Sequence, residues 1–177
     1  MTSSDTEQTP VDDGLVDTLM RRVVAAINAH DADGLVAEMT EDVVLEHSAA
    51  PAPKHGRAEV RAFYANTIFR AFPDLTLELM DGPFFHAHAP RVSFNWLAVG
   101  THTGPLDPPG LAPTNKRFQA DLREILEFRN GLLSRLRIMV DMNDFMRQLG
   151  LFPAPGSQGE KAIAAMQRLQ TKLLRRH

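Results

Sequence analysis

The chain has 177 residues, of which 44% are hydrophobic and 23% are charged, so it can form one globular domain with a substantial core. Its net charge of −3 argues against nucleic-acid binding, and the absence of cysteine excludes disulfides, thiolate catalysis and cysteine-ligated zinc. No apolar run reaches the length that spans a bilayer, and the polar, acidic first residues do not resemble a signal peptide, so we expect a cytoplasmic protein.

The first part of the chain predicts three helices and a short strand. Residues 1–10 predict a disordered tail. An apolar stripe begins at Val11 and indicates a helix to His30, after which Asp31 is the expected N-cap of a short helix ending near Met39. The elements expected next are a strand at 43–47, a proline-rich loop at 48–56 and a long helix at 57–72.

The rest of the chain is richer in strands. Strands are expected at 75–80, 84–88 and 92–102, followed by a proline- and glycine-rich loop at 104–115 that is placed to cover a cavity mouth. A final hairpin and a short helix to Gly150 follow. Helices that precede a run of strands indicate an α+β fold, with the helices packed on the concave face of a curved antiparallel sheet.

The most informative segment is the hairpin around Asn130 and Gly131, the residue pair typical of a type I′ turn. A two-residue loop fixes the register, so that Glu124 faces Arg137 as a charge pair. This register puts Asp141 at the end of an apolar, buried face, where desolvation would raise the pKa of its carboxyl toward that of a base. The alternative is that Asp141 only caps the helix that follows. The expected buried face carries Ala120, Leu122, Leu126, Phe128, Leu133 and Met139, and the other face carries Asp121, Arg123, Ile125, Glu127, Leu136, Ile138 and Val140.

A separate segment is expected after the globular domain at residues 11–152. Residues 153–177 predict a proline-rich linker and a basic helix, with an apolar stripe from Ile163 to Leu174. Such a helix can bind a membrane or a partner, or it can dock on its own domain or on a second subunit. The stripe is short and lacks bulky aromatic residues, which favours docking over membrane binding.

Short motifs follow one another along the chain in a distinctive order and spacing. They are HGRAEVRAFY (His55 to Tyr64), AFPDL (Ala71 to Leu75), VSFNWLAVGTHTG (Val92 to Gly104), GLAPTNKRF (Gly110 to Phe118), FRNGLLSRLRIMVD (Phe128 to Asp141) and RQLG (Arg147 to Gly150). Together they resemble the SnoaL-like polyketide cyclases of the NTF2-like superfamily, over roughly residues 15–152. The resemblance implies a cone-shaped α+β barrel with a deep pocket between the helices and the concave sheet.

The resemblance also implies a reaction. In the family's cyclases, an Asp at the end of the last strand is the acid/base of a cofactor-free intramolecular aldol ring closure. Asp141 occupies that position, by its distance before the QLG sequence, so it is the implied catalytic residue, with no cofactor and with a hydrophobic, polyketide-like substrate. Two positions differ from the family pattern. Asn115 stands where Gly is common, and Met139 stands where the cyclases have His.

Side chains on the expected strands complete the predicted pocket. Alternation along the strand at 92–102 puts Trp96 and His102 on one face and Asn95 on the other. We expect His102, at the strand end beside the long loop, to assist Asp141 in catalysis. Tyr64 could donate a hydrogen bond to a ligand oxygen, but its place in the apolar stripe of its helix favours a core role. The expected substrate-binding residues are His47, Tyr64, Trp96, Leu122 and Met139.

Two further constellations are weaker. His86 and His88 share one strand face and could hold a metal, but no third ligand is close, so no metal site is predicted. Asp121 and Arg123, taken with Asp141, are similar to the site of NTF2-like epoxide hydrolases. The expected register argues against that site, because it puts them on the face opposite Asp141.

Three functions therefore remain open. They are a cofactor-independent cyclase, a non-catalytic protein that binds a small molecule in the same pocket, and an epoxide hydrolase or isomerase on the same fold. We expect a hydrophobic small-molecule partner, no nucleic acid and no membrane. We also expect a homodimer or homotetramer, formed through the outer sheet face where Ile125, Leu136, Ile138 and Val140 lie among charges.

Overall fold

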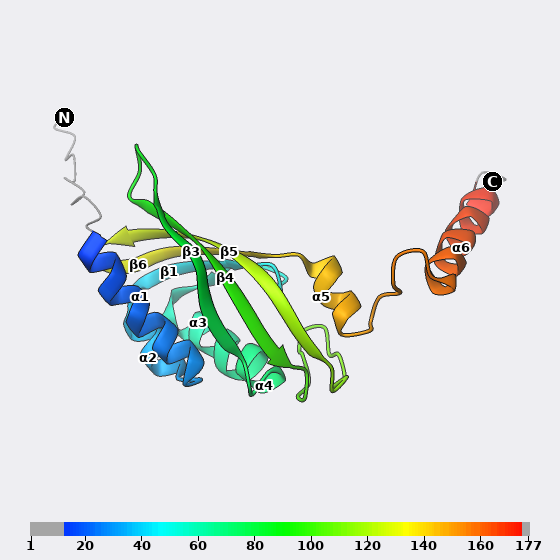
Figure 1. Ribbon diagram of the computed structural model, residues 1–177, viewed down its shortest axis with the longest axis horizontal. Coiled ribbons are helices and arrows are strands. Elements are labelled where there is room, and N and C mark those ends of the chain that lie inside the picture. The colour runs from blue at the N-terminus through cyan, green and yellow to red at the C-terminus, as the bar shows by residue number, and fades with distance from the viewer. Residues whose placement is uncertain (1–12, 175–177) are drawn as a thin grey trace.

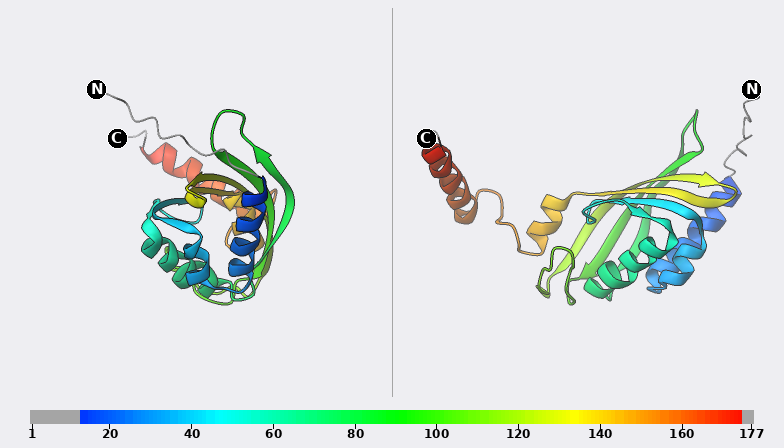
Figure 2. Two further views of the ribbon diagram at one scale, coloured as in Figure 1. Left: turned by 90° about the vertical axis from the view of Figure 1, so that its left-hand side faces the viewer. Right: turned by 180° about the vertical axis from the view of Figure 1, so that it is seen from behind.

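The computed structural model describes residues 13–174, so the tail expected at residues 1–10 lies outside the described residues. A curved sheet with strand order β2-β1-β6-β5-β4-β3 wraps around helices on its concave face (Figures 1 and 2). The strands are β1 (Met39–His47), β2 (Lys54–His55), β3 (Thr76–Phe85), β4 (Arg91–Thr101), β5 (Arg117–Arg129) and β6 (Leu132–Val140). The helices are α1 (Asp13–Asn28), α2 (Ala32–Ala37), α3 (Gly56–Phe63), the π-helical η1 (Tyr64–Ile68), α4 (Phe69–Ala71), α5 (Met142–Gln148) and α6 (Gln158–Leu174).

The expected α+β class and the curved sheet with helices on its concave face are confirmed, with two differences. The sheet does not close on itself, because β2 and β3 remain as its edges. In addition, β1 and β6 pair in parallel, whereas the other neighbours pair antiparallel. β1 follows α2 in the chain and lies beside β6, the last strand in sequence, running in the same direction.

The helices follow the apolar pattern of the sequence. The stripe of α1 is buried against the sheet, and Asp31 accepts a hydrogen bond from the Gly34 backbone N–H at 2.8 Å, which confirms the expected N-cap of α2. The helix expected at 57–72 continues through α3, η1 and α4. Its middle turn is π-helical, which adds one residue and leaves three consecutive side chains, Thr67 to Phe69, buried.

The edge strand β3 was expected as two strands and is one. Irregular register between Leu79 and Phe84 keeps the chain paired with β4 along its whole length. The Asn28 side chain of α1 donates to the Leu77 carbonyl and accepts from the Leu77 N–H, at 3.2 and 2.7 Å. These two hydrogen bonds occupy part of the free edge of β3 and tie α1 to the sheet.

The final hairpin has the expected turn but not the expected register. Asn130 and Gly131 both have positive φ, as a type I′ turn requires. Beyond the turn, Ser134 forms a bulge, with its hydroxyl bonded to the Glu127 carbonyl at 3.1 Å. The bulge shifts the pairing by one residue, so Glu124 pairs with Ile138 and not with Arg137.

A one-residue shift exchanges the two faces of β6 beyond the bulge. The predicted inward placement of Met139 and Asp141 is therefore wrong, since both side chains are exposed on the outer face. The predicted pair of Glu124 with Arg137 is also wrong, because Arg137 binds Glu46. The prediction that Leu136, Ile138 and Val140 form an apolar outer face for assembly is likewise wrong. These three side chains face the inside of the domain.

The C-terminal helix α6 projects from the domain beyond α5 and a proline-containing linker (Figures 1 and 2). Its apolar side chains Ile163, Met166 and Leu169 are exposed, so α6 does not dock on its own domain in this structure, and docking on a second subunit stays a prediction. Within residues 13–174, no helix has both the length and the apolarity that crossing a membrane requires.

Candidate active site

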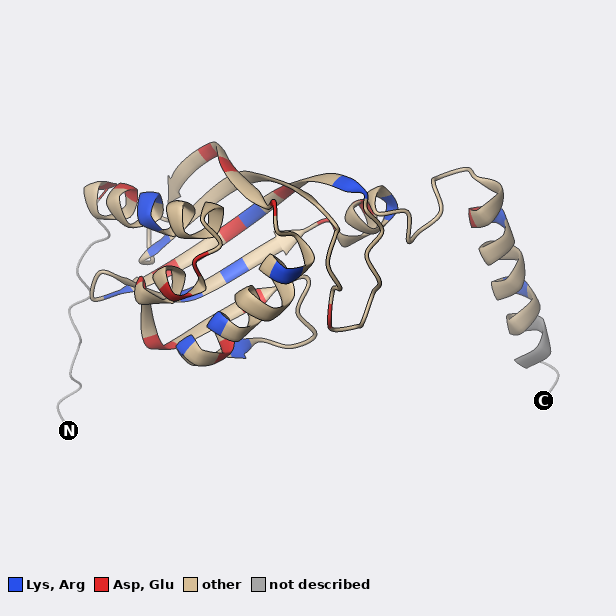
Figure 3. Ribbon diagram, turned by 90° about the horizontal axis from the view of Figure 1, so that it is seen from below, with Lys and Arg blue, Asp and Glu red and all other residues tan. Residues whose placement is uncertain are grey.

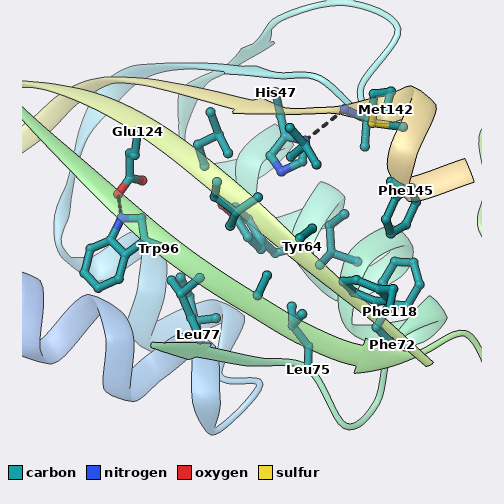
Figure 4. Close-up of a pocket in the computed structure, with 18 residues that line it drawn as sticks. His47, Tyr64, Phe72, Leu75, Leu77, Trp96, Phe118, Glu124, Met142 and Phe145 are labelled. Atoms are coloured by element: carbon teal, nitrogen blue, oxygen red, sulfur yellow. Dashed lines mark hydrogen bonds between the residues drawn. The ribbon is translucent and has the colours of Figure 1, made fainter. Parts of the chain in front are cut away.

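A cavity lies between the concave face of the sheet and the helices, with about 760 Å³ of space when its mouth is included (Figure 4). Eighteen residues line it, and most of them are apolar. The few polar groups come from β1, η1, β4 and β5, so segments distant in sequence meet there. An apolar cavity with a small number of convergent polar groups is the usual form of a small-molecule site. These polar groups belong to His47, Tyr64, Trp96 and Glu124.

Glu124 is the one carboxylic acid among the residues that line the cavity. It is buried on the inward face of β5, between Leu122 and Leu126, and it accepts a hydrogen bond from Trp96 Nε1 at 2.8 Å. Burial raises the pKa of Glu124 to about 7, and the hydrogen bond from Trp96 opposes this rise. The carboxyl group can therefore both take up and release a proton near neutral pH.

His47 lies at the end of β1, and its ring is oriented by the backbone. Nδ1 accepts a hydrogen bond from the Ala49 N–H at 3.0 Å, so the neutral ring carries its proton on Nε2. Burial lowers the pKa of His47 to about 4, which keeps the ring neutral at physiological pH. His47 lines the cavity and offers it a neutral N–H donor, and its role in substrate binding stays a prediction.

Tyr64 begins the π-helical segment and faces the cavity (Figure 4). Burial, together with the nearby negative charge of Glu124, raises the pKa of Tyr64, so its hydroxyl stays protonated and can donate a hydrogen bond. Single π-helical turns inside α-helices often occur at functional sites. Tyr64 was predicted as a substrate-binding or a core residue, and it is both buried and part of the cavity wall.

Asp141 does not line the cavity, although Val140 and Met142 on either side of it do. Its exposed carboxylate caps α5 and accepts hydrogen bonds from the backbone N–H groups of Asn143 and Asp144, at 2.9 and 3.0 Å. The apolar surroundings expected for this carboxylate are therefore absent, because the bulge at Ser134 turns Asp141 outward.

The other predicted site residues divide into two groups. Trp96 and Leu122 line the cavity as predicted, whereas Met139 does not, since its side chain is 40% exposed on the outer face. His102 is fully buried beside Phe72 and Thr114, under the loop at 104–115, and is not part of the cavity wall. The predicted place of His102 in the pocket is therefore not observed, because β4 ends before it and its ring packs beside Phe72 and Thr114.

The sequence analysis gave no role to Glu124, the one carboxylic acid that lines the cavity. The register without a bulge paired it with Arg137 as a charge pair and gave it no chemical role. One signal was present in the sequence. Glu124 interrupts an alternating row of apolar residues, Ala120, Leu122, Leu126 and Phe128, on one face of the strand. A charged residue in such a row is either paired or functional.

The weaker constellations do not form a site. No cluster of three or more His, Cys, Asp or Glu side chains with a metal-binding arrangement occurs within the described part of the chain. Asp121 and Arg123 are exposed on the outer face, as expected. The bulge puts Asp141 on that same face, so the argument that separated it from them was wrong, but all three are exposed to solvent and outside the cavity.

The comparisons with known proteins agree with this fold. The family model of the SnoaL-like polyketide cyclases matches residues 17–149. The chain belongs to this family. AclR from Streptomyces galilaeus, assigned as a hydroxylase, is 25% identical with a TM-score of 0.65, covering 80% of this chain and 100% of its own. TsrD from Streptomyces laurentii is also 25% identical, with a TM-score of 0.66, covering 80% of this chain and 98% of its own.

A protein from Jannaschia sp. CCS1 assigned as a SnoaL-like polyketide cyclase has a TM-score of 0.68 at 18% identity, covering 84% of this SnoaL-like chain and 99% of its own. At that identity the likeness concerns the fold alone. Proteins with this fold are thus named for more than one reaction. The reaction of this chain must therefore be argued from the side chains in its own cavity.

Proposed function

We propose that this SnoaL-like protein is a cofactor-independent cyclase of a hydrophobic, polyketide-like substrate, with Glu124 as its acid/base. The observation that supports this proposal best is the buried Glu124 carboxyl, held by Trp96 inside an apolar cavity, with its pKa raised to about 7. An acid/base with a pKa near the working pH combines a sufficient ionised fraction with sufficient basicity.

The reaction is an intramolecular aldol closure. The Glu124 carboxylate removes a proton from a carbon between two carbonyl groups, and the resulting enolate carbon attacks a second carbonyl of the same molecule. This attacked carbonyl is not one of the two that flank the acidic carbon. A carbon–carbon bond forms, and the π electrons of the attacked carbonyl move to its oxygen. The protonated Glu124 then returns its proton to that oxygen. Atoms and charge balance without a cofactor.

Two neutral donors are available for the enolate oxygen. Tyr64 presents a protonated hydroxyl and His47 presents its Nε2–H, from η1 and β1 respectively (Figure 4). Neutral donors in an apolar site stabilise developing negative charge, and loss of one such donor typically lowers turnover by about 10²–10³-fold. Trp96 has a separate task. By binding one oxygen of the Glu124 carboxylate it fixes the orientation of the other.

Glu124→Gln tests the assignment, with Asp141→Asn as the matched control. Gln keeps the shape of the side chain and an acceptor for Trp96 but cannot accept a proton. We expect Glu124→Gln to lower turnover by about 10²–10⁴-fold with little change in ligand affinity, and Asp141→Asn to leave turnover nearly unchanged. The assay is deuterium incorporation at the activated carbon of an aromatic β-keto ester, followed by NMR.

The pH dependence of wild-type activity provides a second readout. Below about pH 7 activity should rise tenfold per pH unit as Glu124 ionises, and it should level off above that pH. Exchange that persists in Glu124→Gln and is lost in Asp141→Asn would reverse the assignment. Ligand binding without exchange in the wild type would indicate a non-catalytic binding protein.

Asp141 remains the alternative acid/base, as the family resemblance implies. In its favour, Val140 and Met142 both line the cavity, so the Asp141 backbone lies at the cavity wall. Against it, its carboxylate is exposed outside the cavity and is already engaged by two backbone N–H groups at the start of α5. Glu124, in contrast, lies in the cavity wall.

A further inference from the structure

A second hollow space lies between α1 and the β3–β4 pair, on the other side of Trp96 from the candidate active site. This hollow holds about 810 Å³ with its open side included, and Trp96 lines both it and the cavity. The same three elements line both spaces with neighbouring residues, of which the one in the hollow is given first: Val24 and Ile27 of α1, Leu79 and Leu77 of β3, and Phe94 and Ala98 of β4.

The walls of the hollow are mostly buried, as the walls of a small-molecule site are. Val16, Met20 and Phe94 line it and are almost inaccessible to solvent. At one end, the two hydrogen bonds between Asn28 and the Leu77 backbone hold α1 against β3. The hollow is therefore an enclosed space and not a flat apolar surface.

The charged side chains that line the hollow neutralise each other. Asp17 and Arg21 form an ion pair at 2.8 Å on the exposed side of α1, a helix that carries residues of both signs (Figure 3). An ionic group that entered the hollow would lose its hydration to walls that are otherwise apolar, which costs free energy. A neutral ligand avoids this cost.

Two aromatic rings give the hollow a wall that suits a planar ligand. The ring centroids of Phe94 and Trp96 are 5.3 Å apart, with 30° between the ring planes, and both side chains are buried. Contact between aromatic rings contributes about 0.5–1.5 kcal/mol beyond the burial of their area. Trp96 also donates the hydrogen bond that holds Glu124 (Figure 4). A ligand in the hollow would therefore contact the indole that orients the cavity's carboxyl group.

We propose that the hollow is a second small-molecule site, which binds a small neutral aromatic compound against Phe94 and Trp96. An apolar cavity of about 150 Å³ is enough to hold a benzene molecule, so the hollow has room for such a ligand. This site is additional to the proposed cyclase activity. Binding there does not require turnover, so it can be tested whether or not Glu124 is the acid/base.

The fluorescence of Trp96 measures binding, because Trp96 is the single tryptophan of the chain. Bromobenzene is the probe, since it is neutral and aromatic and its bromine quenches tryptophan fluorescence on contact. The full-length wild-type chain should show quenching that saturates as the concentration of bromobenzene rises. Quenching that increases without saturation would overturn the proposal.

Variants that fill one space or the other locate the probe, because Trp96 lines both. Val24→Phe and Leu79→Phe reduce the hollow from opposite walls and should each weaken bromobenzene binding about tenfold or more. Ala120→Leu is the matched control. It reduces only the cavity and should leave the affinity nearly unchanged. Weaker binding in Ala120→Leu, with wild-type affinity in the other two, would place the probe in the cavity and overturn the proposal.

A charged analogue tests the class of ligand. 4-Bromobenzoate has the same ring and bromine but carries a negative charge, so it should bind about tenfold or more weakly than bromobenzene. Equal affinity for the two compounds would overturn the assignment to a neutral ligand. Far-UV circular dichroism shows that each variant is folded. Leu79 is 47% exposed, so Leu79→Phe keeps the test available if Val24→Phe does not fold.

Discussion

Glu124 on β5 and Asp141 directly after β6 are two carboxylates in different surroundings. Glu124 is buried in the cavity, where Trp96 is its hydrogen-bond donor and burial raises its pKa to about 7. Asp141 is exposed and stabilises the first turn of α5 through two backbone N–H groups. Glu124 lies on β5, and Asp141 follows directly after the neighbouring strand β6. Their chemistry differs because one faces the core of the sheet and the other faces solvent.

The bulge at Ser134 is responsible for this difference. Without the extra residue, Arg137, Met139 and Asp141 would face the cavity, and Leu136 and Ile138 would face solvent. One inserted residue therefore turns Asp141 away from the cavity, although it lies well before Asp141 in the chain, whereas Glu124 on β5 faces inward in either register. Bulges often occur beside active sites, where they redirect side chains.

Among the changes proposed here, deletion of Ser134 should have the largest effect on the stability of the fold. Restoring the simple register would expose Leu136 and Ile138, each worth about 1.5–3 kcal/mol of burial, so we expect the free energy of unfolding to fall by roughly 3 kcal/mol or more. Urea unfolding measures this change. Ser134→Ala keeps the bulge and loses only its bond to the Glu127 carbonyl, so it should cost about 1 kcal/mol. If both variants lost the same free energy of unfolding, the deletion would not have changed the register of β6.

The pH dependence of stability tests the surroundings of Glu124. Its folded pKa of about 7 exceeds its ordinary value of 4.5, so ionisation of this group opposes folding. Below about pH 4.5, Glu124 should not change the free energy of unfolding, because it is protonated in both the folded and the unfolded state. As the pH rises from there toward 7, the free energy of unfolding should fall. Above about pH 7 the loss should stay constant. The total change is about 3 kcal/mol.

Glu124→Gln removes this dependence, because the amide does not titrate and still accepts the Trp96 hydrogen bond. The measurement is the difference in unfolding free energy between wild type and variant at several pH values. The variant should match or exceed the wild-type stability at pH 8. A difference that does not change between pH 5 and 8 would mean that the Glu124 carboxyl is well solvated.

Removal of the helix cap formed by Asp141 should have the smallest effect on the free energy of unfolding. Asp141→Ala removes the acceptor for the N–H groups of Asn143 and Asp144 and should cost about 1 kcal/mol in urea unfolding. Asp141→Asn keeps an acceptor oxygen at the cap and should cost much less. If Asn were as damaging as Ala, the charge of Asp141 rather than its cap would matter to the fold.

The sequence by itself determined the fold class and most of its elements. The apolar stripe of α1, the Asp31 cap and the turn at Asn130 and Gly131 depend on local spacing and on backbone preferences, which neighbouring residues dictate. The order of motifs also pointed to the SnoaL-like family. The pocket positions of His47, Tyr64, Trp96 and Leu122 followed from strand and helix periodicity.

Tertiary structure decided which carboxylate lies in the cavity. The bulge at Ser134 leaves no clear sign in the sequence, because it depends on how β6 fits between β5 and β1 and on which side chains the helices can cover. Since side chains alternate along a strand, a one-residue error exchanges inside for outside for every residue beyond it. The raised pKa of Glu124 has the same origin, since it follows from burial that only the packed sheet and helices provide.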